Sequence, residues 1–161
     1  MMLQPSAEKI IRKYQETAPV DVIALAHDLG IAVWQSDKLP KDVSGKLFLD
    51  SKNGGKSGWS ILVRDQDAPV RKRFTVAHEI GHFLLHRSDL GDGITDDEFY
   101  RSGLSNVQEA QANRLAADIL MPYPLINRIM ADGTRDISVI ASKLGVSQAA
   151  LKIRLGIPVT A

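Results

Sequence analysis

The sequence contains no cysteine. This absence excludes a disulfide framework, a thiolate zinc finger, an iron–sulfur cluster and a cysteine nucleophile. No apolar stretch approaches the length of a membrane span, and the first residues lack the apolar segment of a signal peptide. At 161 residues the chain is too short for two well-cored domains. We therefore expect a single cytoplasmic domain over residues 1–161, with no membrane partner.

The chain also lacks an excess of either charge. Twenty lysines and arginines face nineteen aspartates and glutamates, giving a formal net charge of +1. A near-neutral chain has no strong global field for nucleic-acid phosphates, although a local patch remains open. Direct DNA binding is therefore not expected as the main function.

Hydrophobic periodicity and turn residues predict several helices and a small sheet. The expected helices are 5–18, 20–29, about 69–86, 105–120, 122–130, 136–144 and 147–155. The expected strands are 31–34, 46–49 and 59–63, the last two forming a hairpin around the glycine-rich stretch 53–58. Residues 88–105, rich in acidic residues and glycine, are expected to form a loop. The predicted fold class is α+β with a small antiparallel sheet.

The sequence His-Glu-x-x-His occurs once, from His78 to His82. On a helix the two histidines lie four residues apart on one face, so both imidazoles can reach one zinc ion. Glu79 lies beside that face, where its carboxylate can take a proton from a metal-bound water without being a ligand.

The helical wheel of residues 69–86 separates two faces. At about 100° per residue, one face carries the histidines and the other carries an apolar surface for the core. The histidine face holds Arg71, Thr75, His78, His82 and His86, and the apolar face holds Val76, Ala77, Ile80, Phe83 and Leu84.

A catalytic zinc usually has a third protein ligand, and without cysteine this must be a carboxylate or a histidine. Glu109 is the favoured candidate because its predicted helix surrounds it with small and apolar residues, where a carboxylate needs a partner. The alternatives are an inward ion pair with Arg71 or Arg73, or a solvent-facing charge at the helix start. The acidic residues of 88–105 are further candidates, but such runs usually form solvated surface.

Three further residues are candidates for supporting roles. Asn113, one turn after Glu109, could fix the tautomer of a ligand histidine or simply pack as an ordinary amide. His86 could support the site or interact with the helix dipole. Tyr100, like Arg101 and Tyr123, is a candidate donor to a developing oxyanion, and the sequence does not choose among these three.

Two long blocks of the chain resemble one family. The block Arg73–His86 resembles the Phe-Thr-x-Ala-His-Glu-x-Gly-His-x-x-x-His signature of the ImmA/IrrE-type metallopeptidases. The block Glu109–Pro122 resembles that family's Glu-x-x-Ala-Asn-x-Phe-Ala-x-x-Leu-Leu-Met-Pro. Leu115 and Ile119 replace Phe and Leu, and both exchanges are apolar. The resemblance extends from about residue 19 to 155.

The resemblance implies a minimal zincin fold with His78, His82 and Glu109 as metal ligands and Glu79 as general base. Zinc is the default ion, and manganese or ferrous iron also suits two histidines and a carboxylate. The resemblance further implies a protein substrate, a helix-turn-helix repressor or an antitoxin. The substrate segment could add as a strand to the edge of the sheet containing the 46–63 hairpin.

Residues 136–155 also resemble a helix-turn-helix pair, with Gly145 at the turn and Ser147 as helix cap. Taken alone, this segment would indicate a DNA-binding regulator. Its second helix, however, offers only Gln148, Lys152 and Arg154 as polar reading groups. The alternative is a pair of helices that closes the domain. A further alternative is an inactive metal-bound interaction module or a toxin.

Overall fold

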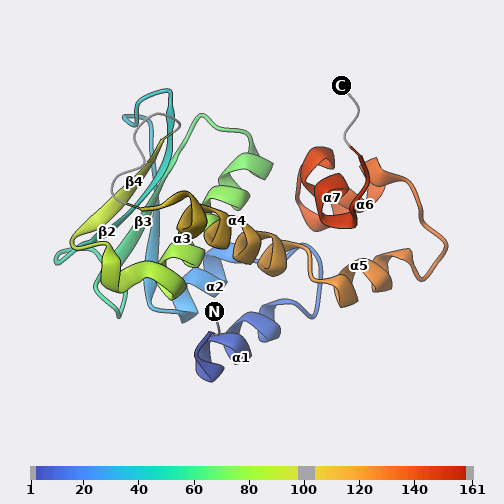
Figure 1. The fold of residues 1–161 in the computed structure, drawn as a ribbon, viewed down its shortest axis with the longest axis horizontal. Coiled ribbons are helices and arrows are strands. Elements are labelled where there is room, and N and C mark those ends of the chain that lie inside the picture. The colour runs from blue at the N-terminus through green and yellow to red at the C-terminus, as the bar shows by residue number, and fades with distance from the viewer. Residues whose placement is uncertain (1–2, 98–103, 159–161) are drawn as a thin grey trace.

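The computed structural model describes residues 3–97 and 104–158, in which a four-stranded sheet lies against a group of helices (Figure 1). The helices of these residues are α1 Pro5–Tyr14, α2 Val22–Asp28, α3 Pro69–His86, α4 Asn106–Leu120, α5 Tyr123–Met130, α6 Ile137–Leu144 and α7 Gln148–Leu155. The strands are β1 Ile31–Ser36, β2 Val43–Leu49, β3 Trp59–Arg64 and β4 Gly93–Asp97, and a 3-10 turn, Arg87–Asp89, follows α3. Within the described ranges, no helix is both long and apolar enough to cross a membrane.

Local signals set most helix ends where the sequence predicts them. The Asp21 side chain accepts a hydrogen bond from the Ala24 backbone at the start of α2. Ser105 and Gln108 form a reciprocal capping box at the start of α4. Gly145 ends α6 in the left-handed conformation, at φ 68°, which glycine adopts without a steric cost.

The first helix is shorter than the predicted range 5–18, because α1 ends at Tyr14. The Gln15 side-chain amide donates to the carbonyl oxygens of Asp118 and Ile119 in α4, at 2.8 and 3.1 Å. The Arg128 side chain of α5 donates in turn to the Gln15 carbonyl oxygen, at 3.0 Å. These long-range bonds hold Gln15 against α4 and α5, after the end of α1.

The sheet has the order β1-β3-β2-β4. The predicted hairpin is confirmed, since β2 and β3 pair antiparallel with Leu47 opposite Ile61. The sheet is mixed rather than purely antiparallel, because β1 runs parallel to β3 with Val33 opposite Ile61. Both hairpin strands are therefore internal, and the edges of the sheet, where a substrate strand could add, are β1 and β4.

The prediction of a loop over 88–105 is wrong for residues 93–97, which form the edge strand β4 against β2. The Leu49 backbone N–H donates to the Asp92 carbonyl oxygen at 2.7 Å and extends this pairing. Gly93, at φ 152°, lies so close to β2 that an added Cβ would be 2.4 Å from the Leu47 carbonyl oxygen. Backbone pairing with β2 outweighs the low strand propensity of this acidic, glycine-containing segment.

The core lies where α3 packs between the sheet and α4. The predicted apolar face of α3 is confirmed by the burial of Val76, Ile80 and Phe83. Phe83 meets Trp59 of β3 edge to face, with ring centroids 6.3 Å apart. On the histidine face, Thr75, His82 and His86 are also buried, and α4 packs against α3.

The α6–α7 pair lies at the other end of the molecule from the sheet (Figure 1). Arg73 of α3 joins the turn of this pair, donating from Nε to the Gly145 carbonyl oxygen at 3.0 Å and from Nη2 to that of Leu144 at 3.3 Å. Burial lowers the pKa of Arg73 from its ordinary value, while two carbonyl oxygens accept hydrogen bonds from its Nε and Nη2 atoms. The turn is thus hydrogen-bonded to the helix that carries His78 and His82.

Candidate metal centre

Helix α3 brings the two motif histidines together as predicted. The Nε2 atoms of His78 and His82 lie 3.1 Å apart, and the ring centroids lie 4.6 Å apart with the rings nearly perpendicular. The His82 side chain is fully buried and that of His78 keeps 12% of its exposure. Both Nε2 atoms therefore face one small, largely enclosed volume.

Glu109 of α4 reaches the same volume. Its Oε1 lies 3.4 Å from His78 Nε2, and its Oε2 lies 3.0 Å from His82 Nε2. The other expected partners of Glu109 bond elsewhere: Arg71 donates to the Ser44 hydroxyl at 2.8 Å, and Arg73 to the α6–α7 turn. Glu109 is 4% exposed, so the expectation of a solvent-facing charge is wrong.

The spacing of these donor atoms fits a metal ion. Tetrahedral zinc holds its ligand atoms at about 2.0–2.1 Å, which places two of them about 3.3 Å apart. The three distances among the His78, His82 and Glu109 atoms are 3.1, 3.4 and 3.0 Å. Two imidazole nitrogens and one carboxylate are a donor set suited to zinc, manganese or ferrous iron.

Glu79 lies beside this donor set and is fully buried. Its carboxylate and the two imidazoles offer ligand atoms within 4.8 Å of one another. On its other side, an atom added as Cβ at Gly45 of β2 would be 3.7 Å from Glu79 Oε2. The carboxylate is therefore enclosed between α3 and β2, next to the histidines.

His86 continues the histidine face and is 1% exposed. Its Nδ1 lies 3.0 Å from Nδ1 of His82, and its Nε2 lies 2.8 Å from Oε1 of Gln111. Gln111 is a residue that the sequence did not indicate, since the helical wheel places it opposite Glu109. Its long side chain overcomes this angular offset, and no periodic pattern could have revealed the contact.

The remaining candidates lie elsewhere or outside the described residues. Asn113 is exposed, whereas its helical position predicted an inward side chain. The Tyr123 hydroxyl donates to the Arg154 carbonyl oxygen at 3.1 Å. Tyr100 and Arg101 lie outside the described residues. Of the acidic candidates, Asp89 accepts a hydrogen bond from the Gln108 side chain at 3.1 Å, at the start of α4.

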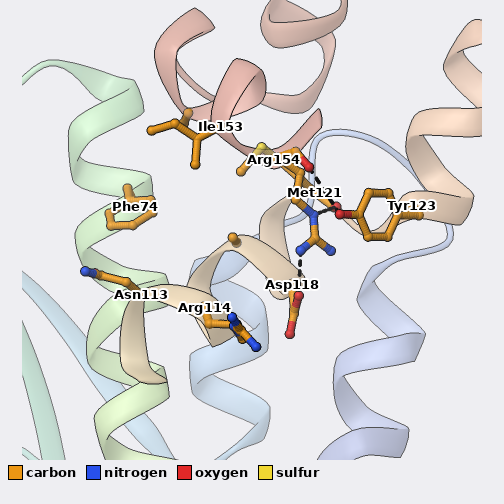
Figure 2. Close-up of a pocket in the computed structure, with 10 residues that line it drawn as sticks. Phe74, Asn113, Arg114, Asp118, Met121, Tyr123, Ile153 and Arg154 are labelled. Atoms are coloured by element: carbon orange, nitrogen blue, oxygen red, sulfur yellow. Dashed lines mark hydrogen bonds and ion pairs between the residues drawn. The ribbon is translucent and has the colours of Figure 1, made fainter. Parts of the chain in front are cut away.

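A groove of about 790 Å³ begins beside these residues and extends toward α7. Phe74, whose ring stacks on His78 at a centroid distance of 6.4 Å, lines one end. Figure 2 shows Phe74 and Asn113 on the side of the groove opposite Tyr123, with Ile153 of α7 above. Arg154 lines the far end, paired with Asp118 at 2.7 Å. On the side of His78, the groove is therefore lined by an aromatic ring, Phe74, and a polar amide, Asn113 (Figure 2).

One helix carries His-Glu-x-x-His, a second helix brings a carboxylate to the two histidines, and a small sheet lies alongside. This arrangement is typical of a metalloprotease domain. The chain belongs to the peptidase M78 family, described as the IrrE N-terminal-like domain, whose pattern matches residues 26–156.

Two curated relatives are both named radiation response metalloprotease IrrE. The one from Deinococcus radiodurans is 42% identical over 72 residues, covering 44% of this chain and 21% of the relative. The one from Deinococcus deserti is 43% identical over 72 residues, covering 44% of this chain and 25% of the relative. The aligned regions therefore span a quarter or less of these relatives.

A solved structure described as a Mycobacterium tuberculosis transcriptional regulator has a similar fold, with a TM-score of 0.63 and 20% sequence identity. The similarity covers 94% of this chain and 46% of that one. At this identity the similarity shows the shared fold alone, and it supports the α+β prediction.

Proposed function

We propose that this chain is a metal-dependent endopeptidase, in which His78, His82 and Glu109 hold one divalent ion, zinc by default. The observation that carries the proposal is the convergence of two imidazole Nε2 atoms and the Glu109 carboxylate within 3.0–3.4 Å of one another. Membership of a peptidase family supports the same chemistry. When bound, the ion would act as a Lewis acid on the scissile carbonyl and on the attacking water.

Glu79 is the proposed general base. Its carboxylate is fully buried beside the histidines, so it can take a proton from the attacking water and deliver it to the leaving amine. Enclosure between α3 and β2 restricts the carboxylate to few orientations, which favours a defined path for the proton.

The proposed substrate is a protein, in particular a helix-turn-helix repressor or an antitoxin, as the resemblance to the ImmA/IrrE-type peptidases implies. We place the substrate residues that flank the scissile bond in the groove between α4 and α7. The groove adjoins the proposed centre at Phe74, whose ring contacts His78, and its apolar wall of Phe74, Met121 and Ile153 suits apolar side chains. The domain would act as one unit over residues 1–161, closed by 136–155.

A DNA-binding role has less support from the contacts of α7. Arg154, one of its three polar reading groups, donates to the Met121 carbonyl oxygen at 2.9 Å and pairs with Asp118. Its side chain is 13% exposed, so it faces α4 rather than a nucleic acid. Only Gln148 and Lys152 then remain as reading groups, too few for base recognition and phosphate contact.

The test is cleavage of a candidate repressor encoded beside this chain, by zinc- or manganese-loaded protein. Mass spectrometry would identify a single cut site, and Glu79→Gln should retain the metal and lose cleavage by a factor of about 10² or more. Equal activity of Glu79→Gln with metal retained would overturn the peptidase mechanism and favour an interaction module or toxin. Binding to operator DNA without cleavage would favour the regulator.

A further inference from the structure

A chain of hydrogen bonds leads from α4 to the proposed ligand His82. Gln111 Oε1 lies 2.8 Å from His86 Nε2, and His86 Nδ1 lies 3.0 Å from His82 Nδ1. His86 and His82 are 1% and 0% exposed, so the bond between them is buried, and the bond from His86 to Gln111 is partly buried. Buried polar groups of this kind have a strong preference for matched donors and acceptors.

The amide oxygen of Gln111 sets which atom donates in each of these hydrogen bonds. An amide oxygen only accepts, so His86 Nε2 must carry the hydrogen that bonds to it. The Nδ1 atom of a neutral His86 then accepts, and the hydrogen shared with His82 must come from His82 Nδ1. A His82 ring protonated at Nδ1 presents a lone pair at Nε2, the atom that faces His78 and Glu109.

The opposite orientation would have the opposite effect. If the amide nitrogen of Gln111 faced His86, His86 would accept at Nε2 and donate from Nδ1 to His82. The hydrogen of His82 would then lie on Nε2, where it would block a metal bond. With His86 neutral, the amide atom of Gln111 that faces His86 would therefore determine which ring nitrogen of His82 carries its hydrogen.

We propose that Gln111 and His86 are positioning residues that fix the tautomer and ring orientation of His82 for metal binding. The inference rests on the proposed metal centre. It also explains why His86 faces inward at the end of α3: its two ring nitrogens have His82 and Gln111 as partners. The same helix α4 then supplies both a ligand, Glu109, and the group that orients the ligand His82.

The test compares two substitutions at position 111. Gln111→Glu keeps an acceptor oxygen, whereas Gln111→Leu removes it with little change in volume. His86→Phe removes the residue that links Gln111 to His82 by hydrogen bonds and provides a second variant. Gln148→Leu, at an exposed position of α7, makes the same chemical change away from the site. Thermal unfolding of each variant would verify that it folds.

Zinc affinity, measured by competition with a chromophoric chelator, should fall about 10- to 100-fold in Gln111→Leu and His86→Phe. Gln111→Glu should stay within about threefold of wild type, and Gln148→Leu should be unchanged. The visible spectrum of the Co²⁺-loaded protein should change in Gln111→Leu and should stay the same in Gln111→Glu. Equal affinities of Gln111→Leu and wild type would overturn the inference.

Nitrogen-15 NMR of the metal-free protein gives a separate reading. The wild type should show the His82 hydrogen on Nδ1, and Gln111→Leu should show a mixture of tautomers. A wild-type hydrogen on Nε2 would overturn the inference even if metal binds. Absence of metal binding with the Nδ1 tautomer present would instead overturn the proposed function and leave the tautomer assignment standing.

Discussion

Gly81 of α3 lies directly against the backbone of Ala112 of α4. A Cβ atom at position 81 would be 3.0 Å from the Ala112 carbonyl oxygen and 3.1 Å from its Cα atom. Gly81 immediately precedes His82, and Ala112 lies three residues after Glu109. The approach of two backbones at this point therefore brings the carboxylate of one helix to the histidine of the other.

Gly81→Ala should lower the free energy of unfolding and weaken metal binding. In an isolated helix, alanine would be favoured over glycine by roughly 0.5–1 kcal/mol. Crowding against backbone atoms costs about 1–3 kcal/mol, so the net effect should be destabilising. Urea unfolding and zinc affinity would measure both effects. A variant more stable than wild type, with unchanged affinity, would contradict this packing role.

Gly45→Ala should disturb the enclosure of Glu79, and Thr75→Ser should partly relieve the effect. The added Cβ would be 2.4 Å from Thr75 Cγ2, the methyl group that serine lacks. We expect Gly45→Ala to cost about 1–3 kcal/mol of unfolding free energy and the double variant to cost less. A double-mutant cycle by urea unfolding measures the coupling. Strict additivity would mean that the two side chains do not clash.

Glu109→Ala should greatly reduce the metal content of the purified protein. The substitution removes the only carboxylate that α4 places at the two Nε2 atoms within the described residues. Metal analysis of wild type should give close to one ion per chain. Glu16→Ala, at an exposed position, serves as the control for the loss of a glutamate. Full metal content in Glu109→Ala would assign the third ligand to another residue.

Ile153→Asp should raise KM for the protein substrate by about tenfold while leaving metal affinity unchanged. Ile153 lines the groove and is 72% exposed, so a substrate could bury it at a gain of roughly 1.5–3 kcal/mol. Val139→Asp makes the same change on α6, where the side chain is 40% exposed and does not line this groove. Cleavage kinetics would compare the two variants, and equal KM values would place the substrate elsewhere.

The thermal stability of the protein should fall at low pH as Asp28 becomes protonated. The Tyr14 hydroxyl donates to the Asp28 carboxylate and, together with Lys13, lowers the pKa of Asp28 below 3.8. Because the folded pKa is lower than the unfolded one, the stabilisation is present above pH 3.8 and is lost as the pH falls through the folded value. Asp28→Asn should therefore lower Tm at pH 7 and have less effect at pH 3.

The stabilisation by the Tyr14–Asp28 hydrogen bond should also be lost at high pH, when Tyr14 is deprotonated. The hydrogen bond to Asp28 raises the pKa of Tyr14 above 10.0, so this contribution is lost as the pH rises through the folded value. Asp37→Asn, an exposed carboxylate change, is the control, and thermal unfolding across the pH range measures both. A difference in Tm that does not vary with pH would contradict the assignment.

The sequence predicted the elements whose patterns are local. Helical periodicity identified α3 with its two faces, and Gly145 and Ser147 marked the end of α6 and the start of α7. The long-range features were missed or wrong. The edge strand β4 depends on pairing with β2, and the parallel pairing of β1 depends on which side of β3 it joins. Neither pairing produces a periodic pattern in the sequence.

The site shows the same division. His78 and His82 follow from spacing, and the inward position of Glu109 follows from its small and apolar neighbours. Gln111 could not be found in this way, because the length of its side chain, rather than its angle on the helix, brings it to His86. The exposure of Asn113 likewise reflects how far α4 is covered, which a helical wheel does not contain.

The close contact of α3 and α4 has a consequence for how the site would respond to a change in metal supply. The apolar core includes residues from both helices and from β2 and β3, so apolar packing positions the helices that carry His78, His82 and Glu109. The entropy of ordering His78, His82 and Glu109 is therefore lost during folding, before any ion arrives. An ion could then leave and return without unfolding the domain, so metal supply would act on this protein as a reversible switch.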